Sequence, residues 1–161
     1  MNKQSAFYFQ AATDNTTLDG NVIFNGARSG VNFNDCFGTG STLQRSVMFN
    51  LNRETADHGC FNSWDRLPFI PQKDAQHRDE VFRNLLLSNF NSYNGLDTDD
   101  DSAYYHMQQN VHLYGHFLKS DYSGHDIEYD GSLGIFVGPS NQYQPVRCSF
   151  LPFDGSRGFC G

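Results

Sequence analysis

Short apolar bursts, separated by polar and turn-forming residues, run along the chain. They read "NVIF" from Asn21, "SVMF" from Ser46, "NLLL" from Asn84 and "NVHL" from Asn110. Apolar runs of this length, bounded by Asn, Ser and Gly, are typical of short β-strands. The pattern predicts an all-β chain with little helix, in which only residues 77–86, "HRDEVFRNLL", have a spacing that allows a helical turn.

The bursts also recur at a distance of about 25 residues, which is the period of a solenoid repeat. Alignment of the first two places Val22, Ile23 and Phe24 on Val47, Met48 and Phe49. Units of this size cannot bury an apolar face alone, so stacking must create the core. We therefore expect one domain over residues 1–161, a parallel β-helix of four to five coils. A β-sandwich of similar strands is the alternative.

The predicted coils start near residues 21, 46, 84 and 110, with a weaker fifth copy from Glu128. The longer distance between the second and third copies indicates an excursion near residues 66–80, a stretch rich in proline and charge.

Charge and hydropathy limit the partners that the chain can have. The formal net charge is -7 and the pI about 5.1, whereas nucleic-acid binders need a basic face. No apolar stretch is long enough for a membrane span. The first residues, "MNKQSAFYFQ", contain no signal-peptide centre. An extracellular or cell-surface location is therefore expected only for a longer protein that includes this chain.

The four cysteines, Cys36, Cys60, Cys148 and Cys160, have neither CxxC nor zinc-finger spacing. A Cys148–Cys160 disulfide and four free thiols both remain open.

The stretch "DHGCFNSWDR", residues 57–66, combines acids, an imidazole, an indole and a guanidinium. Asp57 and His58 are candidates for acid–base catalysis, because His can exchange a proton near neutral pH. Sugars stack on aromatic rings and need directional polar partners. The candidates for substrate binding are Asn62, Trp64, Asp65 and Arg66. Packing of Trp64 and a structural Asp–Arg pair are the alternatives.

A second acidic stretch, "LDTDDDSAYY", brings four carboxylates into five positions. Asp97, Asp99 and Asp100 are candidates for a glycosidase acid–base pair. Asp97, Asp99 and Asp101 are the candidate ligands of a calcium ion, the only cofactor expected, although the stretch does not fit an EF-hand. A solvated acidic turn is the third interpretation.

A third polar stretch, "HFLKSDYSGHD", adds Lys119, Asp121, His125 and Asp126 as candidates for substrate binding. Equivalent positions of successive coils lie about 4.8 Å apart. Asp57, Asp97 and Asp121 have similar offsets from their repeat starts, so we expect the three stretches to converge on one site. Structural Asp and Asn ladders would converge in the same way.

Residues 21–130 resemble a subgroup of the pectin-lyase-like superfamily, through "VNFNDCFGTG", "ADHGCFNSWDRLPF", "NGLDTDDDSAYY" and "SDYSGHD". Cys60 and Asp101 depart from the subgroup pattern, which prefers Pro and Gly there. The resemblance implies a right-handed parallel β-helix with a carbohydrate groove along one face. It also implies a fragment or truncated member of a longer protein, with further coils or a second domain as partners.

The function expected from the resemblance and the paired aspartates is action on a polysaccharide, by glycoside hydrolysis. The alternatives are a polysaccharide lyase, a non-catalytic module that binds glycans, and a structural β-helix. Glycan is the expected partner in the first three cases.

Overall fold

The computed structural model describes residues 7–11, 13–34, 39–64, 77–87, 94–120, 124–138, 141–142 and 147–152. Within these ranges every regular element is a strand and every strand pair is parallel. The strands are β1 (Tyr8–Ala11), β2 (Thr17–Asp19), β3 (Val22–Phe24), β4 (Val31–Asn34), β5 (Thr42–Gln44), β6 (Val47–Phe49), β7 (Phe61–Trp64), β8 (Asp79–Phe82), β9 (Leu85–Leu87), β10 (Asn94–Thr98), β11 (Ala103–Gln108), β12 (Val111–Ser120), β13 (His125–Gly138), β14 (Asn141–Gln142) and β15 (Arg147–Pro152).

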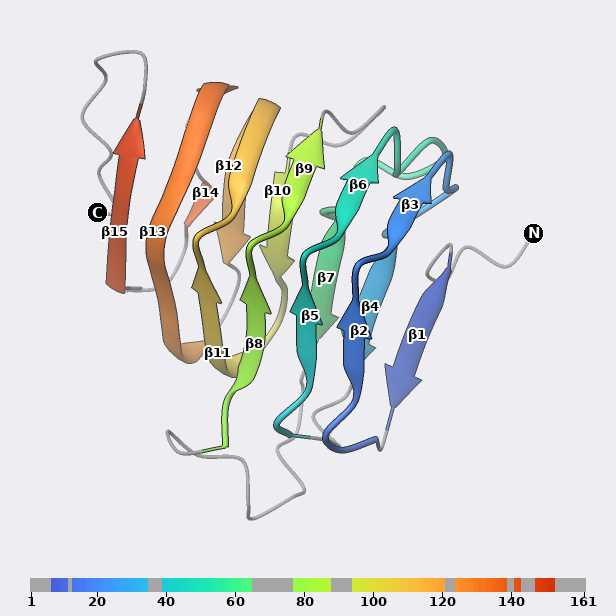
Figure 1. Cartoon of the computed structure of the whole chain (residues 1–161), viewed down its shortest axis with the longest axis vertical. Coiled ribbons are helices and arrows are strands. Elements are labelled where there is room, and N and C mark those ends of the chain that lie inside the picture. Colours follow the sequence, from blue (N-terminus) through green and yellow to red (C-terminus); the bar gives the residue numbers. More distant parts are fainter. Residues whose placement is uncertain are drawn as a thin grey trace.

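The strands form a parallel β-helix of about five coils, as the sequence predicts, with three strand positions in each coil. The first sheet contains β1, β4, β7, β10, the second half of β12 and β14. The second sheet contains β2, β5, β8, β11 and the first half of β13. The third sheet contains β3, β6, β9, the first half of β12 and the second half of β13. β15 pairs with both halves of β13 and so extends the second and third sheets. In Figure 1 the second and third sheets lie in front of the first.

Strand register agrees with the alignment of the repeats. Val22 pairs with Val47, Val47 with Leu85, and Leu85 with Val111. The next partner in this row is Leu133, so the position equivalent to Asn21 in the fifth coil is 132 and not Glu128. The parallel pairing also rules out the β-sandwich.

The core is formed by the inward side chains of the three sheets. Phe33 and Phe61 meet edge to face, with ring centroids 5.2 Å apart, and Phe61 meets Tyr105 in the same way at 6.0 Å. Leu43 and Met48 are fully buried from the other two sheets. Because stacked coils repeat this arrangement, each coil buries the apolar face of its neighbours.

One residue with positive φ turns the chain from the second sheet to the third. The five equivalent positions are Gly20 (φ 68°), Arg45 (51°), Arg83 (56°), Gln109 (53°) and Gly131 (55°). Glycine takes this conformation at the first and last coils, and long polar side chains accept its strain between them. The corner therefore has no constant sequence signal.

A ladder of side-chain hydrogen bonds follows this corner. The backbone N–H of Ser46 donates to Asn84 Oδ1 (2.9 Å), and that of Asn84 donates to Asn110 Oδ1 (3.0 Å). The N–H of Asn110 donates to Ser132 Oγ at 3.0 Å. These bonds join successive coils and satisfy backbone donors where the strands are interrupted.

Residues 77–86 form β8 and the start of β9, with no helical turn, because Val81 and Leu86 both face the core. The excursion predicted over 66–80 ends before β8 begins at Asp79, and residues 65–76 lie outside the described ranges. Among the described residues, no helix is long and apolar enough to cross a membrane.

The cysteines are only partly described. Cys60 is buried in the core, and Cys148 is described by its backbone alone. Cys36 and Cys160 lie outside the described residues, so the predicted alternatives for the disulfide stay open.

Candidate functional site

A row of polar side chains runs across the outer face of the first sheet. Asn32 pairs with Asn62, Asn62 with Asp97, and Asp97 with Lys119. Their neighbours on each side, such as Phe61 and Leu96, point into the core, so alternation along the strands turns this row outward. All four are nevertheless buried. A buried row of amides and charges on an outer face is the most unusual feature of the molecule.

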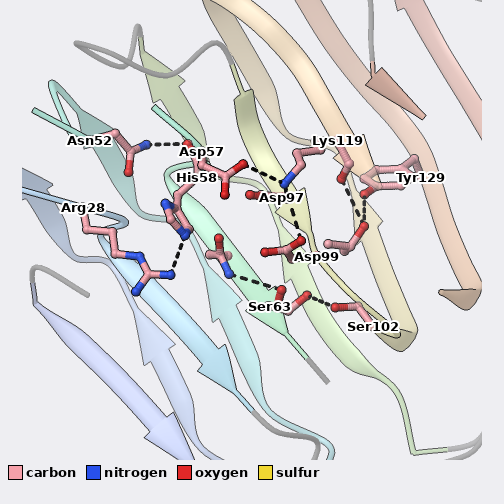
Figure 2. A network of polar contacts seen from close by, with 12 residues as sticks. Arg28, Asn52, Asp57, His58, Ser63, Asp97, Asp99, Ser102, Lys119 and Tyr129 are labelled. Carbon is pink, nitrogen blue, oxygen red and sulfur yellow. Dashed lines mark hydrogen bonds and ion pairs between the residues drawn. The ribbon is translucent and has the colours of Figure 1, made fainter. Parts of the chain in front are cut away.

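Lys119 is the centre of this row. Its ammonium Nζ lies 3.3 Å from Asp57 Oδ1, 3.4 Å from Asp97 Oδ1 and 3.5 Å from Asp99 Oδ1 (Figure 2). The side chain of Asp97 is 0% exposed, that of Asp99 21% and that of Asp57 75%. The three carboxylates therefore form a graded series, from the covered sheet surface to open solvent, around one cation. We call Arg28, Asp57, His58, Asp97, Asp99 and Lys119 the charged cluster.

The loop between β6 and β7 brings Asp57 and His58 to the cluster. Asn52 Nδ2 donates to the carbonyl of His58 at 2.7 Å, and the N–H of Cys60 donates to the carbonyl of Gly95 at 2.8 Å. A Cβ on Gly59 would lie 2.8 Å from that Gly95 oxygen, which is part of the backbone. Glycine in "DHG" is therefore required by the close approach of β10, which holds His58 in place.

Arg28 approaches His58 from the loop between β3 and β4. Its Nη2 donates to His58 Nε2, which fixes the ring proton on Nδ1, because an arginine can only donate (Figure 2). Burial, together with the positive charge of Arg28, lowers the pKa of His58 to about 4. Burial also lowers the pKa of Arg28, against the opposing effect of Asp57, Asp99 and Asp97. His58 is therefore neutral at pH 7.

Hydrogen bonds inside the coil support the floor of the cluster. Thr98 Oγ1 donates to the carbonyl of Lys119 at 3.1 Å and lies 3.2 Å from the hydroxyl of Tyr129. Burial raises the pKa of Tyr129, so its hydroxyl stays protonated. Ser63 and Ser102 share a further bond of 2.8 Å between their hydroxyls. These contacts fix the backbone that carries Asp97 and Lys119.

Several polar atoms beside the cluster have no hydrogen-bond partner within the described part of the chain. They are both amide atoms of Asn32, Asn62 Oδ1 and His58 Nδ1. A buried donor or acceptor without a partner costs about 1–3 kcal/mol.

The structure brings together six of the residues that the sequence singled out: Asp57, His58, Asn62, Asp97, Asp99 and Lys119. Trp64 ends β7 and is half-buried opposite Asn34, next to the row. Asp65, Arg66 and Asp121 lie outside the described residues. In the polar row of the first sheet, the residue of β12 that pairs with Asp97 is Lys119.

The remaining candidates lie elsewhere on the chain. Asp100 and Asp101 occupy the turn after β10. His125 starts β13, where its Nδ1 lies 2.8 Å from Asp126 Oδ2 and its ring meets that of Tyr104 at 5.1 Å. Both members of this pair are half-exposed.

Two of the candidate calcium ligands lie beside a lysine. Asp97 and Asp99 both turn to Lys119. In the described ranges no three His, Cys, Asp or Glu side chains lie close enough to hold a metal ion. An ammonium group occupies the place where three carboxylates would otherwise attract a cation.

Sequence reasoning missed two members of the site, Arg28 and Asn32. Arg28 does align with Arg53 in the repeats, but its role depends on the stacking of two loops. The N–H of Asn52 donates to the carbonyl of Arg28 at 3.1 Å, which holds these loops together. Asn32 belongs to the "VNFN" strand, where its register with Asn62 is the only available signal.

Comparisons of this chain with protein-family models, curated proteins and solved structures gave no match.

Proposed function

We propose that the protein acts on carbohydrate, by hydrolysis of a glycosidic bond at the charged cluster. The observation that supports this proposal is the contact of one lysine with three carboxylates of graded exposure on the outer face of the first sheet. The resemblance of residues 21–130 to the pectin-lyase-like superfamily is part of the proposal and points to the same class of substrate.

The geometry suits a pair of carboxylates. Asp57 Oδ1 and Asp99 Oδ1 both lie within 3.5 Å of Lys119 Nζ. The two oxygens are therefore no more than about 7 Å apart, which includes the separations used by glycosidases. Asp57 is open to solvent and can activate a water molecule. Asp99 is more covered and takes the role of proton donor to the leaving oxygen.

The other members of the cluster bind and orient. Asp97 has a fully buried carboxylate and holds the ammonium of Lys119 against the sheet. His58 stays neutral and accepts a hydrogen bond from the guanidinium of Arg28. The cluster has three carboxylates against two cations, Arg28 and Lys119. This balance favours a neutral sugar over a polyanionic uronate, and so hydrolysis over lyase elimination.

One observation favours a second function, a module that binds glycans without cleaving them. Lys119 contacts Asp57, Asp97 and Asp99 at once, so both candidate catalytic carboxylates already have an ionic partner. Hydrolysis needs one of the pair protonated. Catalysis therefore requires the sugar to displace the ammonium from Asp99, whereas binding alone does not.

The test is a reducing-end assay on a panel of neutral and acidic polysaccharides, with absorbance at 235 nm recorded in parallel. Wild-type protein is compared with Asp57→Asn and Asp99→Asn. We expect each variant to lose at least about 100-fold in rate on a neutral glycan. The matched control is Glu80→Gln, the same change on the second sheet, where Gln can still accept from Gln108 Nε2. Its rate should stay at the wild-type level.

The other outcomes are informative. Growth of absorbance at 235 nm would reassign the site to a lyase. A folded wild-type protein that retains a glycan in affinity electrophoresis, but releases no reducing ends, would establish the binding module. A folded wild-type protein that neither cleaves nor retains any glycan would contradict the proposal.

A further inference from the structure

The outer face of the third sheet is apolar from end to end. In each coil the middle residue of the strand points into the core and its two neighbours point outward. Strand register stacks the outward residues in two columns, Val22–Val47–Leu85–Val111–Leu133 and Phe24–Phe49–Leu87–Leu113–Ile135. We call these ten residues the apolar face. In Figure 1 its strands β3, β6 and β9 lie side by side.

These side chains are open to solvent. Val22 is 63% exposed and Phe24 44%, and the other eight are partly exposed. Phe24 and Phe49 stack with their rings parallel, at 5.0 Å between centroids. Contiguous apolar patches on proteins mark binding surfaces more often than single exposed residues do.

The coil does not require this apolar character. The corresponding outward columns of the second sheet are Thr17–Thr42–Glu80–His106–Glu128 and Asp19–Gln44–Phe82–Gln108–Asp130. Nine of those ten positions are polar, although the backbone and the inward packing are equivalent. The residues of the apolar face are therefore not explained by the folding of the coil.

We propose that the apolar face is the surface through which two copies of this chain associate face to face. Five strands about 4.8 Å apart give a flat area roughly 25 Å long and 15 Å wide. Contact between two such faces would bury about 750 Å² of flat area in total, below the roughly 1,000 Å² of a stable specific interface and in the range of weak, transient contacts. The dimer is accordingly weak, with a Kd in the micromolar range.

Charge and shape both favour a second copy as the partner. None of the ten side chains is charged, so the contact buries no unpaired charge, although the chain has a net charge of -7. Two identical sheets have the same spacing of columns, so the side chains of one fit between those of the other about a two-fold axis. This surface is distinct from the charged cluster, and the inference does not depend on the proposed function.

The experiment is sedimentation velocity of the full chain at concentrations from 1 to about 500 µM. We expect the wild-type protein to shift from monomer to dimer over this range. Leu87→Lys places a charge at the centre of the apolar face and should weaken association at least about 100-fold. Thr42→Lys, an outward change at the second sheet, should leave the dimer unchanged.

A gentler variant covers the case in which Leu87→Lys does not fold. Val47→Thr with Val111→Thr keeps the shape of both side chains and adds two hydroxyl groups, and should weaken association about tenfold.

Three results would overturn the inference. One is a monomer at every concentration. Another is a dimer that resists both the lysine and the threonine variants. The last is a dimer that is lost only with Phe9→Lys, at the edge strand β1, which would indicate end-to-end stacking of coils.

Discussion

The outer faces of the first and third sheets have the same backbone and opposite chemistry. Both are parallel stacks of short strands, and both lie over the same core. On the first sheet the outward row contains Asn32, Asn62, Asp97 and Lys119, and it is buried. On the third sheet the outward columns are Val, Leu, Ile and Phe, and they are partly exposed. On each face the side chains are the opposite of what burial predicts, because the buried residues of the first sheet are polar and the exposed residues of the third are apolar.

This reversal separates what the fold needs from what the surface does. The inward positions of both sheets carry the residues that a stacked core requires, such as Phe61 and Met48. The outward positions are free of that requirement, as the polar second sheet shows. Buried charge and exposed apolar area both cost free energy, which is why we propose a binding role for each face: a glycan at the first sheet and a second copy at the third.

The largest effect is expected from Lys119→Met, which removes the cation at the centre of the charged cluster on the first sheet. The change leaves the fully buried carboxylate of Asp97 without the cation that compensates it. Loss of one partner of a buried ion pair costs about 3–5 kcal/mol, and we expect a loss of this size for Lys119→Met. The measurement is the free energy of unfolding in urea.

Two further variants sharpen this prediction. Asp97→Asn in the Lys119→Met background should recover part of the loss, because no buried charge then remains. Arg45→Met removes an exposed ion pair with Asp19 and should leave the free energy of unfolding almost unchanged. Equal losses for Lys119→Met and Arg45→Met would show that the cluster is no more than surface charge.

A smaller effect is expected from Gly59→Ala, which tests how tightly the first sheet holds its loop. The new Cβ would lie 2.6 Å from the carbonyl oxygen of Phe61 and 2.8 Å from that of Gly95. Backbone must move to relieve this overlap, at a cost of about 2–3 kcal/mol in thermal unfolding.

Gly20→Ala is the matched control at the corner between the second and third sheets. Its Cβ meets nothing within 4 Å, so only the positive φ of 68° opposes it. The expected cost is about 1 kcal/mol. A Gly20→Ala protein less stable than Gly59→Ala would contradict the close approach at β10.

The fold could be predicted because its signal repeats. Val22, Val47, Leu85 and Val111 occupy the same place in successive apolar bursts, and their strands pair in that register. The corner between the second and third sheets could not be predicted. Its positive φ falls on Arg45, Arg83 and Gln109, whose identity gives no sign of a turn.

The sequence predicted which residues form the site better than it predicted which of them lie side by side. Asp57, His58, Asp97, Asp99 and Lys119 were all singled out, and they do meet. Counting from the repeat starts placed Asp57, Asp97 and Asp121 in one row. The count drifted because the connection from the third sheet to the first changes in length, becoming longer from the first coil to the second and shorter from the second to the fourth. Asp97 therefore pairs with Asn62 and Lys119.

The residues of the apolar face belong to the same apolar bursts, but the sequence does not show that they point outward. A run such as "NLLL" gives Leu85, Leu86 and Leu87, and only Leu86 is buried. Sequence alone cannot tell an inward leucine from two outward ones, because all three satisfy the apolar pattern of a covered strand.

The smallest effect concerns two neutral histidines, one at each face. His58 lies at the charged cluster with a pKa lowered to about 4 by burial and by Arg28. His112 lies under the apolar face, between Leu86 and Gly134 in the inward column, and burial lowers its pKa to about 3. As pH falls below 6.5, the unfolded chain binds protons that the folded chain does not. Folding stability is therefore lost between about pH 6.5 and the folded pKa values.

His112→Leu separates the two contributions. Leucine fits the apolar column and does not titrate, so the variant should lose about 2 kcal/mol less than the wild type between pH 8 and pH 5. The measurement is urea denaturation at both pH values, and carboxylate titration cancels because both proteins share it. Parallel loss of stability in the two proteins would mean that His112 accepts a proton in the folded state. The acid sensitivity would then belong to the polar side of the molecule, where His58 and Arg28 meet.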